Sequence, residues 1–261
     1  MPRIKPVWKP GDPPTSALAR KIINAYYNDI FLLPVIYGEP RIGKSAYALK
    51  VLFQVYDFIW GWDMYRVYEE CMGFRPAEVI MDWKKLGRKI PGYIWDDAGC
   101  WLFTLDYQDP LLKEVQRYFN VLSTDIQCLI LTTPDPTWIL NKIGKMPGSK
   151  WIKIIRVYGD DTHLGPWTDS IRYSRRALTY TPWRAPDLKK TGVSKPWIQD
   201  DYSCRLPDEL YEYYKPKREY YAGLVKERMW SAMNDKVNQE KVKANRLKED
   251  LDKLNTRVIQ A

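Results

Sequence analysis

Short apolar runs alternate with amphipathic segments through the first 160 residues of the chain. Apolar residues at helical spacing predict helices, which occupy residues 17–27, 44–59 and 110–122. Short apolar runs predict buried strands, which occupy residues 31–37, 78–83, 92–95, 127–132 and 151–158. Pro34 lies inside the first of these strands and favours a place near a sheet edge. Strands that alternate with helices predict an α/β fold whose mainly parallel sheet is covered by helices on both faces.

The segments outside this alternation differ from it in composition. Residues 1–14 hold five of the 19 prolines and predict an extended basic arm. Residues 15–158 form the predicted core, and 159–216 form a basic and aromatic extension without a clear period. Residues 217–261 predict a long amphipathic helix. Its apolar positions fall at 3–4 spacing, interrupted at Glu240, and are Trp230, Met233, Val237, Ala244, Leu247, Leu251, Leu254 and Val258.

Composition narrows the class of protein. The 261 residues are 45% hydrophobic and 28% charged, which predicts a folded chain. A net charge of +9 is as consistent with a polyanionic partner, nucleic acid above all, as with a solvated basic surface without a partner. Four separated cysteines and one histidine argue against a zinc site or a disulfide framework. No apolar run suits a membrane span or a signal peptide, so we expect a cytoplasmic protein without a membrane partner.

The strongest motif is a complete GxxxxGKS, GEPRIGKS, between a predicted strand and a predicted helix. Backbone amides of such a loop can hold phosphate oxygens, Lys44 can reach the β and γ phosphates, and Ser45 can bind Mg²⁺. The cofactors predicted are therefore ATP and Mg²⁺. The predicted nucleotide-binding residues are Gly38, Glu39, Pro40, Arg41, Ile42, Gly43, Lys44, Ser45 and Ala46.

Two further strand ends carry candidate chemistry. The run YIWDD ends in Asp96, a candidate Mg²⁺ ligand acting through water, and Asp97, a candidate to polarise the attacking water. The run CLILTT ends in Thr132 and Thr133, either of which could contact the γ-phosphate or the water. The predicted catalytic residues are Lys44, Asp97 and Thr132, and the predicted metal-binding residues are Ser45 and Asp96.

Together these motifs resemble the additional-strand class of P-loop ATPases over roughly residues 15–158. VIYGEPRIGKS, YIWDDAG and LILTTPDP are most similar to ATPases carried by archaeal viruses and plasmids, which resemble bacterial replication initiators and helicase loaders. The resemblance implies that the LILTT strand lies between the P-loop strand and the Asp96 strand. It also implies homo-oligomers in which one subunit presents an arginine to the nucleotide of the next. Two departures are Asp97, where many members have Glu, and the lack of a recognisable Sensor-2 lid.

Several arginines have more than one interpretation. The candidates for the intersubunit arginine are Arg117, Arg156, Arg172, Arg175 and Arg176. Arg172, Arg175 and Arg176, interleaved with aromatic residues, are also candidates to bind nucleic-acid phosphates and bases, or else form a solvated strand face. The C-terminal helix is expected to bind a partner helix, or else to pack on its own ATPase core.

The sequence thus favours a Mg²⁺-dependent ATP hydrolase that acts on DNA, as an initiator or helicase-loader-like protein in replication of a mobile element. A DNA translocase or genome-packaging motor is the alternative. A second alternative is a nucleotide-dependent assembly switch that binds no nucleic acid. A small-molecule kinase is disfavoured, because the Asp96-Asp97 pair and the hydroxyl-ended strand suit attack by water.

Overall fold

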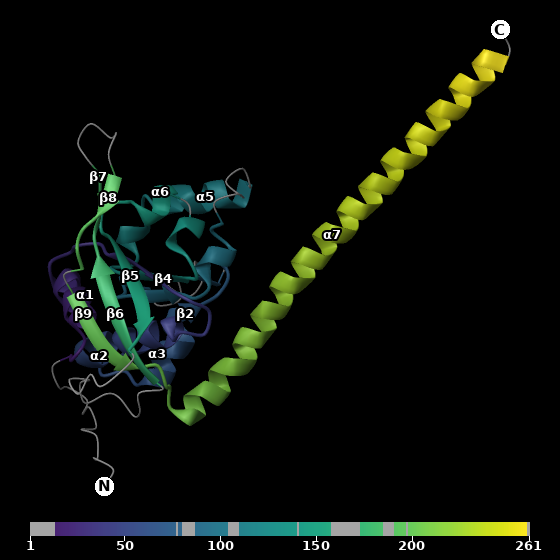
Figure 1. Cartoon of the computed structure of the whole chain (residues 1–261). Helices are drawn as coiled ribbons and strands as arrows, with labels where there is room; N and C mark the ends of the chain where they lie inside the picture. Colours follow the sequence, from purple (N-terminus) through teal and green to yellow (C-terminus); the bar gives the residue numbers. More distant parts are fainter. Residues whose placement is uncertain are drawn as a thin grey trace. The chain divides into compact units, whose positions relative to one another are not determined.

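The computed structural model describes residues 14–76, 78–79, 87–103, 110–139, 141–157, 173–184, 191–196 and 198–259. The chain divides into two units, Met1–Pro207 and Asp208–Ala261 (Figure 1). The predicted basic arm lies almost entirely outside the described residues. None of the helices in the described part of the chain combines the length and the apolar character that a bilayer crossing requires.

A seven-stranded sheet organises the first unit. Its spatial order is β2-β3-β4-β1-β5-β6-β9. The strands are β2 (Met72–Gly73), β3 (Tyr93–Trp95), β4 (Leu129–Thr133), β1 (Leu33–Tyr37), β5 (Ser149–Arg156), β6 (Ser174–Tyr180) and β9 (Ile198–Ser203). The first five pair in parallel, and β6 and β9 are added antiparallel. The mainly parallel sheet is confirmed, and so is the place of the LILTT strand, β4, between β1 and β3.

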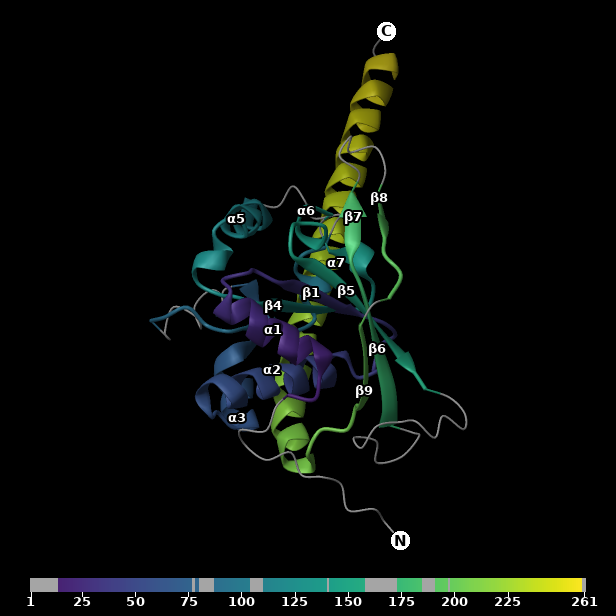
Figure 2. The ribbon, with the colours of Figure 1, turned by 90° about the vertical axis from the view of Figure 1, so that its left-hand side faces the viewer.

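Helices cover both faces of this sheet. α1 (Ala17–Tyr27) and α2 (Lys44–Trp60) lie on one side, and α5 (Pro110–Tyr118) and α6 (Asn141–Gly144) lie on the other (Figure 2). The apolar spacing of α2 buries a stripe that includes Ala48, Val51, Leu52 and Val55 against α1 and the central strands. This packing fixes the position of α2, whose first turn follows the P-loop.

Pro34 lies in a central strand, so the expectation of an edge position was wrong. Leu32 donates its N–H to Gln127 on the β4 side, and Leu33 donates to Gly148 on the β5 side. By this alternation, Pro34 lacks a donor on the β4 side alone. The pairing with β4 accordingly skips from the Leu32–Cys128 bridge to Val35–Leu131, while the ladder with β5 runs without interruption. A central parallel strand therefore accepts this proline at the cost of one hydrogen bond.

The strand predicted over 78–83 was also wrong where it can be tested, because Glu78 and Val79 are helical and 80–86 lie outside the described residues. The short strand β2 precedes this turn. A helix, α3 (Met64–Cys71), lies between the predicted helix 44–59 and the predicted strand 78–83, where the sequence predicted no element. Asp63 caps α3, because its carboxylate accepts from the Arg66 N–H. This capping residue was a local signal for the helix that the sequence-based prediction did not use.

The extension after residue 158 is regular over most of its described part. Besides β6 and β9 it holds a short antiparallel ribbon, β7 (Pro182–Arg184) with β8 (Thr191–Val193). The second unit is the helix α7 (Asp208–Ile259), which begins before the predicted start at residue 217 and contains Pro216. Its first turn contains the acidic residues Asp208 and Glu209, whose negative charges interact favourably with the positive end of the helix dipole. Pro216 removes one backbone hydrogen bond, and the helix continues through it.

Candidate nucleotide-binding site

Three strand ends meet at the carboxyl edge of the sheet. The order β3-β4-β1 places the P-loop after β1 beside the Thr132 end of β4, which lies beside the Asp96 end of β3. Neighbouring parallel strands direct their carboxyl ends to the same edge. The three segments singled out in the sequence are therefore brought together in space.

The P-loop has a backbone shape that its glycines make possible. Gly38 and Gly43 have φ values of 147° and 102°, in the range that side chains rarely adopt. A Cβ on Gly38 would lie 2.8 Å from the carbonyl oxygen of Ile154, and a Cβ on Gly43 would lie 2.4 Å from Cys204 Cβ. Arg41 also has a positive φ, 61°. These residues turn the chain tightly into the amino terminus of α2, where backbone amides can face an anion.

Lys44 is the first residue of α2, and its ammonium group lies within the loop. Its Nζ donates to the carbonyl oxygens of Gly38 and Glu39, 2.9 Å away in each case. Only 8% of the residue is exposed. Because the stem is buried and the charged end is held at the loop, the cation is directed to the place where phosphates would bind.

Asp96 is the centre of a hydrogen-bond network that joins the three strand ends. Ser45 Oγ donates to Asp96 Oδ1 at 2.8 Å, and Thr132 Oγ1 donates to the same oxygen at 2.6 Å. The Asp97 amide donates to Thr132 Oγ1 at 2.8 Å. Asp96 and Thr132 are fully buried. Ser45 and Asp96 thus present adjacent hard oxygen donors, the kind that Mg²⁺ prefers, and this donor set fits that ion.

Asp97 follows in a left-handed conformation, with φ of 50°. This turn leads directly into the short 3-10 helix η1 (Ala98–Cys100). A Cβ on Gly99 would lie 2.4 Å from Thr133 Oγ1, so the segment packs closely on the end of β4. An unusual backbone conformation held by close packing is typical of functional sites.

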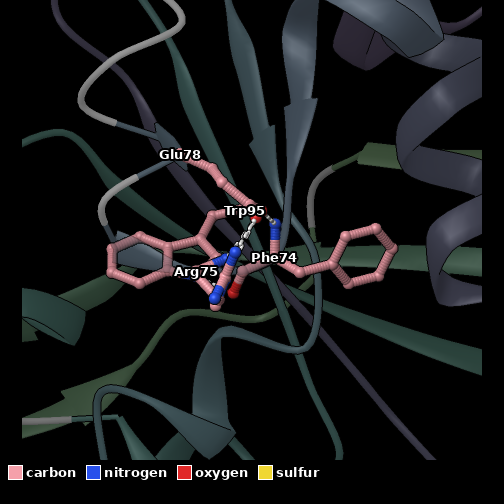
Figure 3. Close-up of polar contacts among 4 residues, drawn as sticks. All are labelled: Phe74, Arg75, Glu78 and Trp95. Atoms are coloured by element: carbon pink, nitrogen blue, oxygen red, sulfur yellow. Dashed lines mark hydrogen bonds and ion pairs between the residues drawn. The ribbon is translucent and has the colours of Figure 1, made fainter. Parts of the chain in front are cut away.

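The neighbouring strand β2 and the turn after it fix the end of β3. The Asp96 amide donates to Gly73 O, and Trp95 Nε1 donates to Phe74 O, both at 2.9 Å. Figure 3 shows how Glu78 holds this turn: its carboxylate accepts from the amide of Phe74 and from the guanidinium of Arg75. The backbone at Asp96 is therefore held in place by β2 and by the turn that follows it.

The antiparallel strands contact the P-loop from its other side, which sequence reasoning did not predict. Arg175 Nε on β6 donates to Ile42 O at 2.9 Å, and Tyr202 Oη on β9 donates to Gly43 O at 3.1 Å. These partners are 133 and 159 positions apart, so no local pattern could reveal them. Burial, with a further contribution from the Cys204 thiol, raises the pKa of Tyr202 well above 10.0, which keeps its hydroxyl proton available.

The arginines predicted to bind nucleic acid lie in different environments. Arg175 is buried, with 8% exposed, and donates to the P-loop and to Ser174 O. Arg176 makes two bonds to the Asp201 carboxylate, at 2.8 and 3.1 Å. Arg172 lies outside the described residues. Because Arg175 is buried and donates within the chain, it is poorly placed to contact a nucleic-acid phosphate at the surface. Nucleic-acid binding by Arg176 stays a prediction.

The other candidates for the intersubunit arginine are paired within the chain. Arg156 Nη2 lies 3.9 Å from the carboxylate of Glu39, a residue of the P-loop. Arg117 pairs with Glu114 one turn away on α5, and both side chains are largely exposed. Exposed pairs of this kind cost little to break, so an intersubunit role for either arginine stays a prediction.

Asp200 joins β9 to both helices of the same face. Its carboxylate accepts from Ser16 Oγ at 2.7 Å, from the Ala17 amide at 2.8 Å and from Tyr47 Oη at 2.6 Å. The negative charge also lies at the amino terminus of α1, where the helix dipole favours it. Since Tyr47 is in the first turn of α2, Asp200 ties the helix after the P-loop to the added strands.

Comparison with known proteins places this architecture in a family. Protein B-251 of Sulfolobus spindle-shape virus 1, itself described as uncharacterized, is 30% identical over 211 residues, which are 78% of this chain and 80% of that protein. The chain belongs to the B-251 family. Its relative is a protein of an archaeal virus, and this confirms the predicted resemblance to proteins that such viruses carry. No family model matches the sequence.

A solved structure was also matched. It is the genome packaging NTPase B204 from Sulfolobus turreted icosahedral virus 2 in complex with ATP-gammaS, with a TM-score of 0.34 and 12% identity over 66% of this chain and 100% of that one. The assignment to the P-loop fold rests on this chain's own strand order and its GxxxxGKS loop.

Proposed function

We propose that this B-251 family member is a Mg²⁺-dependent ATP hydrolase that acts on DNA in the life cycle of a virus. The observation that carries the proposal is the network Ser45–Asp96–Thr132–Asp97 beside the P-loop. It gathers two hydroxyls and a buried carboxylate at one sheet edge, and the backbone amide of Asp97 joins that residue to them. This is the set that phosphoryl transfer to water requires.

Each residue has a part in the proposed reaction. Amides of the P-loop and the Lys44 ammonium hold the β and γ phosphates, and neutralise the charge that develops there. Ser45 and Asp96 would hold Mg²⁺, which supplies further positive charge to the phosphate oxygens when bound. Asp97 orients and polarises the attacking water, and Thr132 keeps the two aspartates in register. We expect the protein to act in the cytoplasm of the infected cell.

DNA is the proposed partner because of charge. The chain has a net charge of +9, and residues 215–261, most of α7, hold 12 basic and 7 acidic residues for a net +5. With Arg175 buried and Arg176 paired, we place the main phosphate contacts on α7 rather than on β6. An initiator or helicase-loader-like role remains the leading proposal, in a homo-oligomer, and a DNA translocase or packaging motor remains the alternative.

The nucleotide proposal is tested by ATP binding and turnover with a Mg²⁺ titration. Lys44→Ala should lose both binding and turnover. Asp97→Asn should bind ATP while hydrolysing it at least about a hundredfold more slowly, since general-base groups contribute about 10²–10⁴-fold. Melting curves without nucleotide check that each variant is folded. Turnover by folded Lys44→Ala at the parent rate would refute the proposal.

The DNA proposal is tested by binding as a function of salt. Replacing five lysines of α7 with glutamine keeps good helix formers and removes the +5 of that segment. These lysines are Lys226, Lys236, Lys241, Lys243 and Lys248. The slope of log affinity against log salt should become shallower by about 0.9 for each DNA phosphate that the variant no longer neutralises. Arg176→Gln is the matched control, and a shallower slope in that variant alone would place the phosphate-binding residues on β6.

The effect of DNA on ATP turnover then distinguishes the three proposed biological roles. Steep stimulation of ATP hydrolysis by long duplex DNA would favour the translocase or packaging motor over the initiator. An ATP-dependent increase in particle mass on DNA, with slow turnover, would favour the initiator. Retained ATP binding with no DNA binding at moderate salt would favour the nucleotide-dependent assembly switch.

A further inference from the structure

Two donors from the antiparallel strands end on consecutive carbonyl groups of the P-loop. Arg175 donates through Nε to Ile42 O, and Tyr202 donates through Oη to Gly43 O. The two residues are directly opposite each other in the β6–β9 register. Both are largely buried, with 8% and 6% exposed. One cross-strand pair therefore holds two adjoining peptide groups of the loop.

The direction of these bonds has a consequence for the loop amides. In a trans peptide the C=O and the following N–H point in opposite directions, and the chain has no cis peptide among its described residues. A donor that fixes Ile42 O toward β6 fixes the Gly43 N–H away from β6. In the same way, Tyr202 fixes the Lys44 N–H through Gly43 O, which also accepts from the Tyr47 amide in α2.

We propose that Arg175 and Tyr202 are positioning residues that keep the Gly43 and Lys44 amides directed toward the nucleotide phosphates. This inference rests on the proposed function and extends the nucleotide site to strands outside the predicted ATPase core. The buried guanidinium of Arg175 adds a fixed positive charge beside the loop, which favours an anion there. Cys204 packs against Gly43 from the same side.

The strands are held near the P-loop independently of these two bonds. Lys50 on α2 donates to the carbonyl oxygens of Ser203 and Arg205, both at 2.6 Å. The Tyr202 ring also packs on the Tyr47 ring, with centroids 4.8 Å apart. Removing the Tyr202 hydroxyl alone should therefore leave β9 in place and release only the orientation of the loop peptide.

The experiment measures the dissociation constant for a fluorescent ATP analogue with Mg²⁺, together with KM and kcat, in the full chain. Tyr202→Phe should weaken binding about two- to tenfold, the size of one neutral hydrogen bond. Its KM should rise while kcat changes little, because the amides hold the phosphates in the ground state and the transition state alike. Arg175→Gln should weaken binding by about tenfold or more, since a charged donor is removed. Arg175→Lys, which keeps the charge and one donor, should recover part of the affinity.

Tyr56→Phe is the matched control. Tyr56 Oη donates to Gly92 O at 2.7 Å, so this variant loses a buried tyrosine–carbonyl bond on α2 away from the P-loop. It should lower the melting temperature and keep the parent affinity for ATP. Parent affinity in both Tyr202→Phe and Arg175→Gln would overturn the inference, as would equal loss of affinity in Tyr56→Phe. Absence of ATP binding by the parent protein itself would instead refute the proposed function.

Discussion

Thr132→Val tests the network around Asp96 with almost no change in side-chain volume. The hydroxyl of Thr132 donates to Asp96 at 2.6 Å and accepts from the Asp97 amide at 2.8 Å, in a fully buried position. Valine keeps the β-branched shape that suits β4 and removes both bonds. The substitution therefore separates the hydrogen bonds from the packing of the strand.

The magnitude follows from these two bonds. A bond to a carboxylate contributes about 1.5–3 kcal/mol and a neutral bond about 0.5–1.5 kcal/mol. The added methyl group of valine offsets about 0.8 kcal/mol when it is buried. We expect a net loss of about 1–4 kcal/mol in the free energy of unfolding. For a chain of this size, that is a fall of roughly 2–16 °C in melting temperature.

The assay combines a melting curve with ATP turnover, and Thr132→Ser is the control. Serine keeps the hydroxyl, so most of the turnover should return, although the missing methyl group lowers stability. Thr132→Val should lower turnover by about tenfold or more, because the Asp96 carboxylate and the Asp97 backbone lose the hydrogen bonds that orient them. Thr133 Oγ1 contacts only a carbonyl, that of Asp135, among the bonds described for it, so Thr133→Val should destabilise less. Parent stability and parent turnover in Thr132→Val would refute the reasoning.

Two further predictions concern the anchoring of the added strands. Asp200→Asn should destabilise the fold by about 2–4 kcal/mol in denaturant unfolding, because an amide cannot accept from all of the donors that surround this carboxylate. Asp201→Asn keeps one acceptor oxygen for the two Arg176 donors and should cost less, about 1–2 kcal/mol. Equal losses in the two variants would contradict the role given to Asp200. Burial raises the pKa of Tyr47 and Tyr202 well above 10.0, with Asp200 adding to the rise at Tyr47. The folded state then keeps protons that the unfolded state releases, so stability is fully present below about pH 10 and should fall above it by about 1.4 kcal/mol per pH unit for each tyrosine. Tyr202→Phe should make that alkaline decline shallower, and an unchanged slope would contradict this assignment.

The sequence by itself determined the features that depend on neighbouring residues. The loop GEPRIGKS, the helices α1 and α2 and the strands β1, β3, β4 and β5 were predicted close to their observed bounds. Capping, apolar periodicity and glycine conformations act over a few positions, so their signals are present in the order of residues. The place of β4 beside β1 came from the resemblance to P-loop ATPases, and the strand order confirmed it.

Tertiary structure decided which distant residues support the site. Pro34 is tolerated at the sheet centre because only the pairing with β4 loses a bond, a fact that depends on which strand lies on each side. The sequence pattern predicted that Arg175 is an exposed cation. In the folded chain β6 pairs with β5, and Arg175 is a buried donor to Ile42 O. Tyr202 reaches Gly43 from 159 positions away. Long-range strand pairing brings these groups together, and because a local sequence pattern carries no information about that pairing, only the folded chain shows them.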